Sequence, residues 1–208
     1  ADVEMLKMMG LPRGSLSYFK SDSVFIYIQM QLCNYSLCNW LDENQATEYR
    51  DLPRMKSWFK QIVSAVDYIH EKNLIHRDLK PSNILFAEKD LLRVCDLGIV
   101  TQRSVDDEPA TTIFRTVAGT VLYMSPEQRS IRRYSSKTDV FTLGLILVEL
   151  CVAMSNALRE QTFENYRRGI HSELVEEART AEFVGRLIQE DPKDRPTCRE
   201  MLDDLYLC

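Results

Sequence analysis

Apolar residues recur at intervals of three and four between residues 52 and 72, the spacing that gathers side chains on one face of an α-helix. Pro53 falls in the first turn of this segment, where the backbone N–H that proline lacks has no partner to lose. A second segment, residues 139–154, is apolar at nearly every position and indicates a helix that is buried on most sides. We therefore expect one amphipathic helix and one central core helix. The periodic apolar positions of the first segment are Met55, Trp58, Phe59, Ile62, Val63, Val66 and Ile69.

Short apolar runs predict a few β-strands, gathered in the first half of the chain. Val24–Cys33 is rich in β-branched and aromatic residues, a composition typical of a strand. Residues 84–86 and 91–98 predict two more small strands, joined by a turn at residues 88–90.

The remaining segments are expected to be helices and one long loop. Residues 36–44 predict a short helix, and residues 101–118, which are polar and rich in Thr and Arg, predict a mobile loop. After the central helix, two or three further helices are expected, separated by residues 190–196. This balance of many helices and few strands predicts an α+β fold.

Composition fits a globular chain of one domain or slightly more: 208 residues, of which 45% are hydrophobic and 27% are charged. The net charge of −5 disfavours a broad nucleic-acid-binding surface in this region. The longest apolar run, Val140–Met154, is interrupted by Thr142, Gly144 and Glu149. It is also shorter than the roughly 18 residues that cross a bilayer, so we expect no membrane segment here.

Cysteine usage bears on the cellular compartment. Six scattered cysteines without a C-x-x-C motif predict reduced thiols and a cytoplasmic setting, and three dispersed histidines argue against a zinc site. The first ten residues lack the cationic and apolar regions of a signal peptide, so secretion is not expected. A longer parent chain could still be anchored in a membrane with this region facing the cytosol.

Charged and amide side chains are concentrated between two apolar flanks in the stretch Asn73–Phe86. Within it, His76, Arg77 and Asp78 are followed five residues later by Asn83, which gives the pattern H-R-D-x-x-x-x-N. Four specified positions arise by chance in roughly one chain per thousand of this length. Further matches follow in order over about 120 residues: Asp96-Leu97-Gly98, Ser125-Pro126-Glu127, Asp139 with Gly144, and Arg195.

Taken together, these motifs resemble the C-terminal lobe of a eukaryotic protein kinase. The resemblance covers residues 34–208, and residues 1–33 are expected to be a remnant of the small lobe. The implied parts are the last small-lobe strand and hinge at 24–33, a catalytic loop at 76–83, an activation segment at 96–127 and a helical bundle at 128–208.

The resemblance assigns chemical roles to five residues. Phosphoryl transfer depends mainly on positioning and on charge neutralisation. Asp78 would be the catalytic base that holds the incoming hydroxyl, and Lys80 would reach the transferring phosphate. Asn83 and Asp96 would bind Mg²⁺, which prefers oxygen ligands. Arg77 implies control by a phosphorylated activation segment, because arginine pairs well with phosphate.

The expected cofactors are therefore ATP and Mg²⁺. The resemblance places Met30 behind the adenine as the gatekeeper. Gln31, Leu32 and Cys33 would form the hinge whose backbone binds the adenine, and Leu85 would lie beneath it.

The activation segment implies a regulatory threonine. Thr116 is the candidate for autophosphorylation, although its register is shifted by one, and Thr111 and Thr112 are alternatives. Thr120 matches the threonine that contacts the catalytic base.

Other matched residues are expected to be structural. Glu127 and Arg195 would form a buried ion pair, and Asp139 would hold the backbone of the catalytic loop. His76 is expected to pack rather than to act as an acid or base. Leu97, which stands where these kinases have Phe, would keep an apolar plug beside Asp96.

Longer stretches resemble a particular group of serine/threonine kinases: YIQMQLCNYSLCNWL, IHRDLKPSN, GTVLYMSPEQ and YSSKTDVFTLGLILVEL. They are similar to the kinases of the α subunit of translation initiation factor 2, most of all the endoplasmic-reticulum stress-sensing member and next the double-stranded-RNA-activated one. The resemblance implies phosphorylation of a serine in that subunit, repression of translation under stress and a homodimeric full-length kinase. It also implies that Asn156–Arg168 is the substrate-docking helix.

Two motifs of a complete kinase are missing from these 208 residues: G-x-G-x-x-G, which covers the phosphates, and V-A-x-K, which supplies a strand lysine. Three interpretations remain open. The chain is a fragment of an active kinase whose small lobe lies elsewhere, a naturally truncated kinase that binds ATP weakly, or a non-catalytic module that docks the substrate or a full-length kinase. Positioning contributes ~7–11 kcal/mol to such reactions, so we expect little or no activity from these residues alone.

Overall fold

The computed structural model describes residues 29–45, 50–97, 101–102, 121–130, 135–170 and 178–204. The chain divides into two units, Ala1–Gln31 and Leu32–Cys208. Of the first unit only residues 29–31 are described, and they have no regular secondary structure. The elements below all belong to the second unit.

The amphipathic helix predicted from the three-four spacing is α3, Leu52–Glu71. Asp51 caps its first turn by accepting a hydrogen bond from the backbone N–H of Arg54 at 3.2 Å. The periodic apolar side chains are buried, except that Ile69 is only half-buried. The prediction of one buried face is confirmed.

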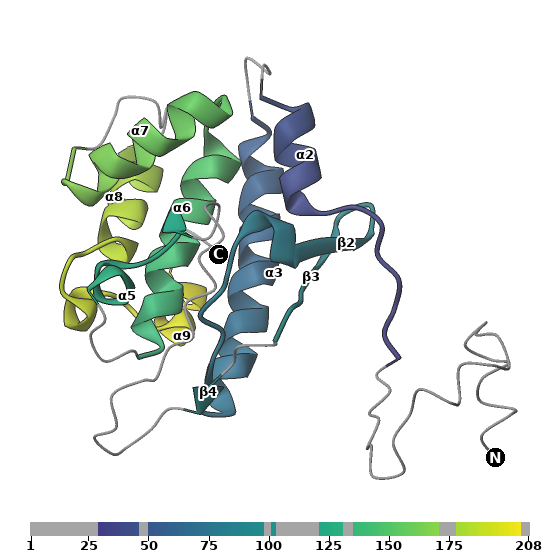
Figure 1. The fold of residues 1–208 in the computed structure, drawn as a ribbon, viewed down its shortest axis with the longest axis horizontal. Coiled ribbons are helices and arrows are strands. Elements are labelled where there is room, and N and C mark those ends of the chain that lie inside the picture. Colours follow the sequence, from purple (N-terminus) through teal and green to yellow (C-terminus); the bar gives the residue numbers. More distant parts are fainter. Residues whose placement is uncertain are drawn as a thin grey trace, which may run out of the picture. The chain divides into compact units, whose positions relative to one another are not determined.

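The central helix is α6, Lys137–Cys151, whose side chains are buried from Thr138 onwards. Figure 1 shows α6 between α3 on one side and α7 and α8 on the other. Gly144 permits the approach of α8: a Cβ at this position would lie 2.7 Å from Ile188 Cγ2 and 3.0 Å from Leu187 Cβ. A glycine in mid-helix is tolerated here because close packing against the neighbouring helix requires it.

The two small strands predicted after the catalytic-loop motif are β2, Ile84–Glu88, and β3, Leu91–Val94, which pair antiparallel. Their turn is fixed to α3 by Asp90, which accepts hydrogen bonds from Arg54 Nε at 2.7 Å and Trp58 Nε1 at 2.9 Å. Trp58 also packs edge-to-face against Trp40, with ring centroids 5.0 Å apart. The hairpin is thereby held against the helix that precedes it in the chain.

Short elements complete the described fold. β1, Leu74–Ile75, pairs antiparallel with β4, Thr101–Gln102. The others are α2 Leu37–Glu43, the 3-10 turn η2 Pro81–Asn83, α5 Pro126–Arg129, α7 Asn156–Arg167, α8 Ala178–Leu187, the 3-10 turn η3 Pro192–Asp194 and α9 Cys198–Leu202. The predicted mainly helical α+β fold is confirmed.

Two local predictions differ from the structure. The strand expected over Val24–Cys33 is wrong for residues 29–33, whose backbone has no strand pairing, and residues 24–28 lie outside the described part. The loop expected at 101–118 begins as strand β4, and the rest of it lies outside the described part. The composition of residues 29–33 indicated a high β-propensity. A strand forms only where a neighbouring strand offers an edge for pairing, and composition does not show this.

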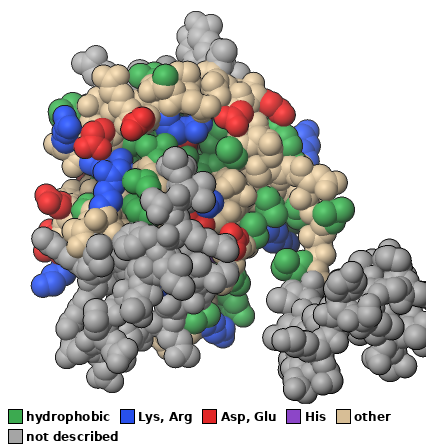
Figure 2. All heavy atoms as spheres, viewed as in Figure 1, with side chains coloured by type: hydrophobic (Ala, Val, Ile, Leu, Met, Phe, Trp, Pro, Cys, Tyr) green, Lys and Arg blue, Asp and Glu red, His purple; other side chains and the backbone are tan. Residues whose placement is uncertain are grey.

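The surface is mixed in charge. On the face shown in Figure 2, acidic and basic side chains are interspersed over the described residues. Within these described ranges, none of the helices combines the length and the apolar character needed to cross a membrane.

Candidate active site

The catalytic-loop motif lies between β1 and η2, and its backbone is held by a carboxylate from α6. Asp139 accepts hydrogen bonds from the backbone N–H of His76 and of Arg77, both at 2.9 Å. Arg77 has a φ of 68°, a left-handed conformation that is unfavourable for a residue with a side chain. The two bonds from Asp139 stabilise this turn and so determine where the next residue, Asp78, is placed.

His76 is fully buried and joins the catalytic loop to the residue before Asp96. Its Nε2 lies 3.0 Å from the carbonyl oxygen of Cys95, and its Nδ1 accepts from the backbone N–H of Asp78 at 3.4 Å. The neutral tautomer with its proton on Nε2 satisfies both bonds. This geometry agrees with a packing role and leaves His76 away from any substrate.

Asp78 has two carboxylate oxygens in different environments. Its Oδ2 accepts from Lys80 Nζ at 2.7 Å and from Asn83 Nδ2 at 3.3 Å, and Asn83 Nδ2 also donates to the Asp78 carbonyl at 2.8 Å. Its Oδ1 is buried and has no hydrogen-bond donor within the described part of the chain. A buried carboxylate oxygen without a donor is costly, so this atom has hydrogen-bonding capacity that the described residues leave unused.

The two predicted metal ligands flank the β2–β3 hairpin: Asn83 directly precedes β2 and Asp96 follows β3. The backbone N–H of Cys95, the residue before Asp96, donates to the Asn83 carbonyl at 2.9 Å. Because Asn83 Nδ2 is used on Asp78, its side-chain Oδ1 is the atom left to face a cation. Across the described ranges, no group of three or more His, Cys, Asp or Glu side chains could hold a metal ion. One carboxylate and one amide oxygen nevertheless fit Mg²⁺, which takes further oxygens from phosphates and water.

The adenine-site residues are only partly assembled in this unit. Leu85 is half-buried and its backbone forms an antiparallel bridge with Ser36, three residues after Cys33. Leu32 is exposed, and Met30 and Gln31 belong to the other unit. Their roles at the adenine therefore stay predictions.

Among the remaining predicted residues, Leu97 is a correction. Its side chain is 55% exposed, so it does not form the expected apolar plug. Leucine is smaller than phenylalanine and here contributes little burial beside Asp96. Thr111, Thr112, Thr116 and Thr120 lie outside the described residues. The phosphate-sensing role of Arg77 also stays a prediction.

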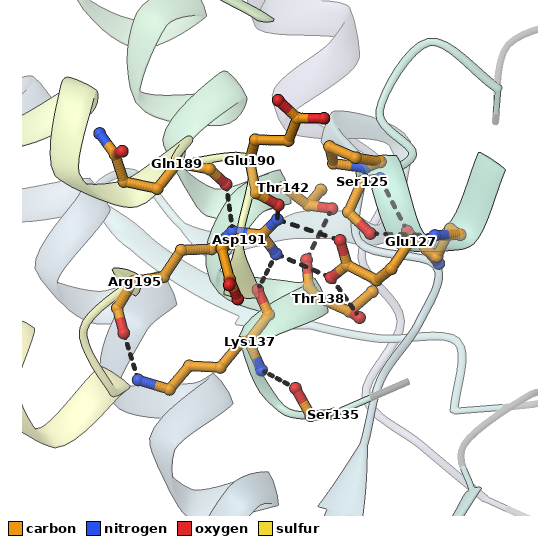
Figure 3. A network of polar contacts seen from close by, with 12 residues as sticks. Ser125, Glu127, Ser135, Lys137, Thr138, Thr142, Gln189, Glu190, Asp191 and Arg195 are labelled. Carbon is orange, nitrogen blue, oxygen red and sulfur yellow. Dashed lines mark hydrogen bonds and ion pairs between the residues drawn. The ribbon is translucent and has the colours of Figure 1, made fainter. Parts of the chain in front are cut away.

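Glu127 and Arg195 form the expected buried ion pair, with Arg195 Nη1 and Nη2 at 2.7 and 3.0 Å from the two carboxylate oxygens (Figure 3). The other Arg195 donors bind the carbonyls of Gln189, Lys137 and Glu190 at 2.7–3.0 Å. All five donors of the guanidinium are therefore satisfied. Burial alone would raise the pKa of Glu127, but the hydrogen bonds and charge of Arg195 outweigh it and lower that pKa.

Sequence reasoning missed a second buried charge cluster. It treated Glu149 only as an interruption of an apolar run, yet this fully buried carboxylate accepts from Tyr123 Oη at 2.7 Å and lies 2.5 Å from Arg159 Nε. The available signal was the acid itself, because a carboxylate in a helix that is buried all round must have partners.

Glu149 makes stability depend on pH. Burial, partly offset by Arg159 and Tyr123, raises its pKa from 4.5 to about 7. Between these two pH values the unfolded chain has released the Glu149 proton while the folded chain retains it. The contribution of Glu149 to stability is therefore full below pH 4.5 and is lost as the pH rises to about 7. We expect this group to reduce stability by up to about 1.4 kcal/mol per pH unit in that window.

Urea unfolding at pH 5, 6, 7 and 8 measures this effect. Glu149→Gln, which stays neutral, is expected to remove that part of the slope. Glu160→Gln, an exposed position on α7, serves as the control and should leave the slope unchanged. Parallel pH profiles for the original chain and Glu149→Gln would contradict the prediction.

Comparison with known families matches residues 14–207 to the protein kinase domain. The chain is 35% identical over 203 residues to eukaryotic translation initiation factor 2-alpha kinase pek-1 of Caenorhabditis elegans, covering 89% of this chain and 19% of that protein. It is 35% identical over 195 residues to the interferon-induced, double-stranded RNA-activated protein kinase of Rattus norvegicus, covering 92% of this chain and 37% of that one. Eukaryotic translation initiation factor 2-alpha kinase 3 of Rattus norvegicus is 37% identical over 196 residues, covering 88% of this chain and 18% of that protein.

These relatives agree with the resemblance found in the motifs. The chain spans about a fifth to somewhat over a third of the length of these curated relatives. The match to the kinase domain includes the catalytic loop, the segment before α5 and the helices that bury Asp139 and Arg195. The chain belongs to the protein kinase domain family.

Proposed function

We propose that this chain provides the catalytic loop of a serine/threonine protein kinase that transfers the ATP γ-phosphate to a protein serine. The observation that supports this most is Asp78, whose Oδ2 is held by Lys80 and Asn83 while its buried Oδ1 has no donor among the described residues. Such a carboxylate is oriented by its neighbours and keeps one oxygen for an incoming hydroxyl.

Each residue of the loop then has a defined task. Asp78 Oδ1 accepts the hydrogen bond of the serine hydroxyl, orients its oxygen and takes its proton as the phosphate bond forms. Lys80, whose Nζ lies 2.7 Å from Asp78 Oδ2, brings a positive charge next to the base and toward the transferring phosphate. Asp139 keeps the loop in place through the backbone of His76 and Arg77.

Asn83 and Asp96 are the residues that would hold Mg²⁺. When bound, Mg²⁺ and ATP supply the phosphoryl group and the neutralisation of its charge. The chain would contribute an amide oxygen and a carboxylate, and the proposal is supported by the backbone bond between Asn83 and Cys95, the residue before Asp96.

The α subunit of translation initiation factor 2 is the proposed protein substrate, and α7 is proposed as the helix that docks it. Support comes from the relatives, two of which are named for kinase activity toward that subunit. A role in repressing translation under stress, action in the cytoplasm and homodimerisation of a longer parent kinase belong to the same proposal.

The test uses two polypeptides. Purified residues 1–208 are expected to show little or no phosphorylation of the α subunit, because they contain neither G-x-G-x-x-G nor V-A-x-K. A chimera that joins residues 29–208 to the small lobe of the rat double-stranded RNA-activated relative is expected to phosphorylate it. Asp78→Ala in the chimera should lower the rate by about 10²–10⁴-fold, the usual contribution of a positioned base.

Circular dichroism and ATP binding of the chimera provide the controls. A folded, ATP-binding chimera that phosphorylates a generic serine peptide but not the α subunit would contradict the proposed substrate. It would leave the proposed serine kinase activity standing. A folded chimera without activity on either would favour a non-catalytic docking module. Robust activity of residues 1–208 alone, lost in Asp78→Ala, would show that the missing motifs are dispensable.

A further inference from the structure

Residues 121–124, which lead directly into α5, are held in place from α7. Arg167 donates through Nη2 to the carbonyl of Leu122 and, at 3.4 Å, to the carbonyl of Met124. The ring of Phe163 packs edge-to-face on Tyr123 with centroids 5.5 Å apart. The position of this segment therefore depends on the position of α7.

Glu149 adds an electrostatic connection between the same two parts. It projects from α6, with one oxygen bonded to the Tyr123 hydroxyl and the other 2.5 Å from Arg159 of α7. The Glu149 side chain is 1% exposed and that of Arg159 is 13% exposed, so the pair is shielded from water. Burying such a pair gives little net stability compared with apolar side chains of the same volume. A carboxylate supplies two contacts here that an apolar side chain would not: a hydrogen bond from Tyr123 and a charge contact with Arg159. The Arg159 contact is an ion pair without hydrogen-bond alignment.

The other end of the segment reaches the catalytic loop. Ser125 caps α5, and Gln128 of that helix donates through Nε2 to the carbonyl of Arg77 at 3.0 Å. Arg77 directly precedes Asp78, the proposed base. A series of contacts thus runs from Arg159, through its ion pair with Glu149 and the hydrogen bond between Glu149 and Tyr123, along the backbone into α5 and to the carbonyl of Arg77.

We infer that Glu149 and Arg159 are positioning residues that couple α7 to the catalytic loop through Tyr123 and α5. The inference rests on the proposed function, in which α7 docks the protein substrate. It adds a route by which docking on α7 affects the position of the base, Asp78. Arg159 itself offers little exposed surface to a partner, so it acts through Glu149 rather than by contact with the substrate.

Hydrogen exchange of residues 1–208 tests the coupling without requiring catalysis. Arg159→Ala is expected to speed exchange of the α5 amides Arg129 and Ser130 by about tenfold, because α5 loses its support. Arg159→Lys, which keeps the charge, should restore exchange to within about threefold. Arg186→Ala is the matched control: it removes another arginine–carboxylate pair, to Asp204 at 2.6 Å, on α8, and should leave α5 exchange unchanged.

A second arm measures affinity for the purified α subunit of translation initiation factor 2 by biolayer interferometry. Arg159→Ala and Glu149→Gln are expected to weaken binding about tenfold, with recovery in Arg159→Lys and no change in Arg186→Ala. If the original chain fails to bind the subunit, the substrate of the proposed function is wrong and exchange alone decides the coupling. Unchanged α5 exchange in Arg159→Ala, or no recovery in Arg159→Lys, would overturn the inference whatever the affinity.

Discussion

Arg195→Ala is expected to lower the free energy of unfolding by about 3–5 kcal/mol. The substitution leaves Glu127 buried without its countercharge, so the main contributions that lower the pKa of that carboxyl are lost while burial still raises it. It also removes donors from the carbonyls of Gln189, Lys137 and Glu190, which lie around the guanidinium (Figure 3). One truncation therefore affects α5, α6 and the turn before η3 together.

Urea unfolding at neutral pH measures this loss. Arg186→Ala, which breaks a partly exposed pair with Asp204, is expected to cost no more than about 1 kcal/mol and serves as the control. Arg195→Lys keeps the charge but cannot form the paired contact with both oxygens of Glu127, so it should recover only part of the loss. A loss below about 1 kcal/mol in Arg195→Ala would contradict the prediction.

Asp139→Ala is expected to remove about 2–4 kcal/mol of stability and to disable the catalytic loop. The backbone N–H groups of His76 and Arg77 both lose their acceptor, and each unsatisfied buried group costs about 1–3 kcal/mol. With these two bonds lost, the left-handed turn at Arg77 should relax and displace Asp78. A displacement of about 1 Å can reduce a rate by roughly 10²-fold, which is the loss we expect in the active chimera.

Exchange of the His76 and Arg77 amides in residues 1–208, together with the phosphorylation rate of the chimera, provides the measurement. Asp139→Asn is the discriminating variant: its amide oxygen can accept one bond, but its NH₂ group would face the second N–H donor. It should therefore recover less than half of the stability. Protected amides and an unchanged rate in Asp139→Ala would show that another part of the loop maintains its geometry.

The sequence allowed the helices and the closeness of the catalytic-loop side chains to be predicted because both are local. The three-four spacing of α3 and the continuous apolar character of α6 are visible in a short window, and burial follows directly from them. The same holds for Asp78, Lys80 and Asn83, which lie within six positions of one another and are brought together by η2.

Features that depend on distant partners could not be predicted in the same way. Strand β4 exists because Thr101–Gln102 meets β1, and polar residues in the sequence gave no sign of that pairing. Residues 29–33, expected to be a strand, pair with no strand within the described part of the chain. The contact between Glu149 and Arg159 joins two helices, so the register of each helix alone does not determine it. The Oδ1 of Asp78, which has no donor among the described residues, likewise depends on the tertiary packing around the loop.

The edge-to-face contact of Trp40 with Trp58 has a practical consequence. These are the two tryptophans of the chain, and each also lies under an arginine, Arg50 over Trp40 at 4.7 Å and Arg54 over Trp58 at 4.6 Å. Tryptophan fluorescence therefore originates at one place, the junction of α2, α3 and the β2–β3 turn. Movement of α2, which follows the hinge segment in the chain, can be followed optically without any introduced label.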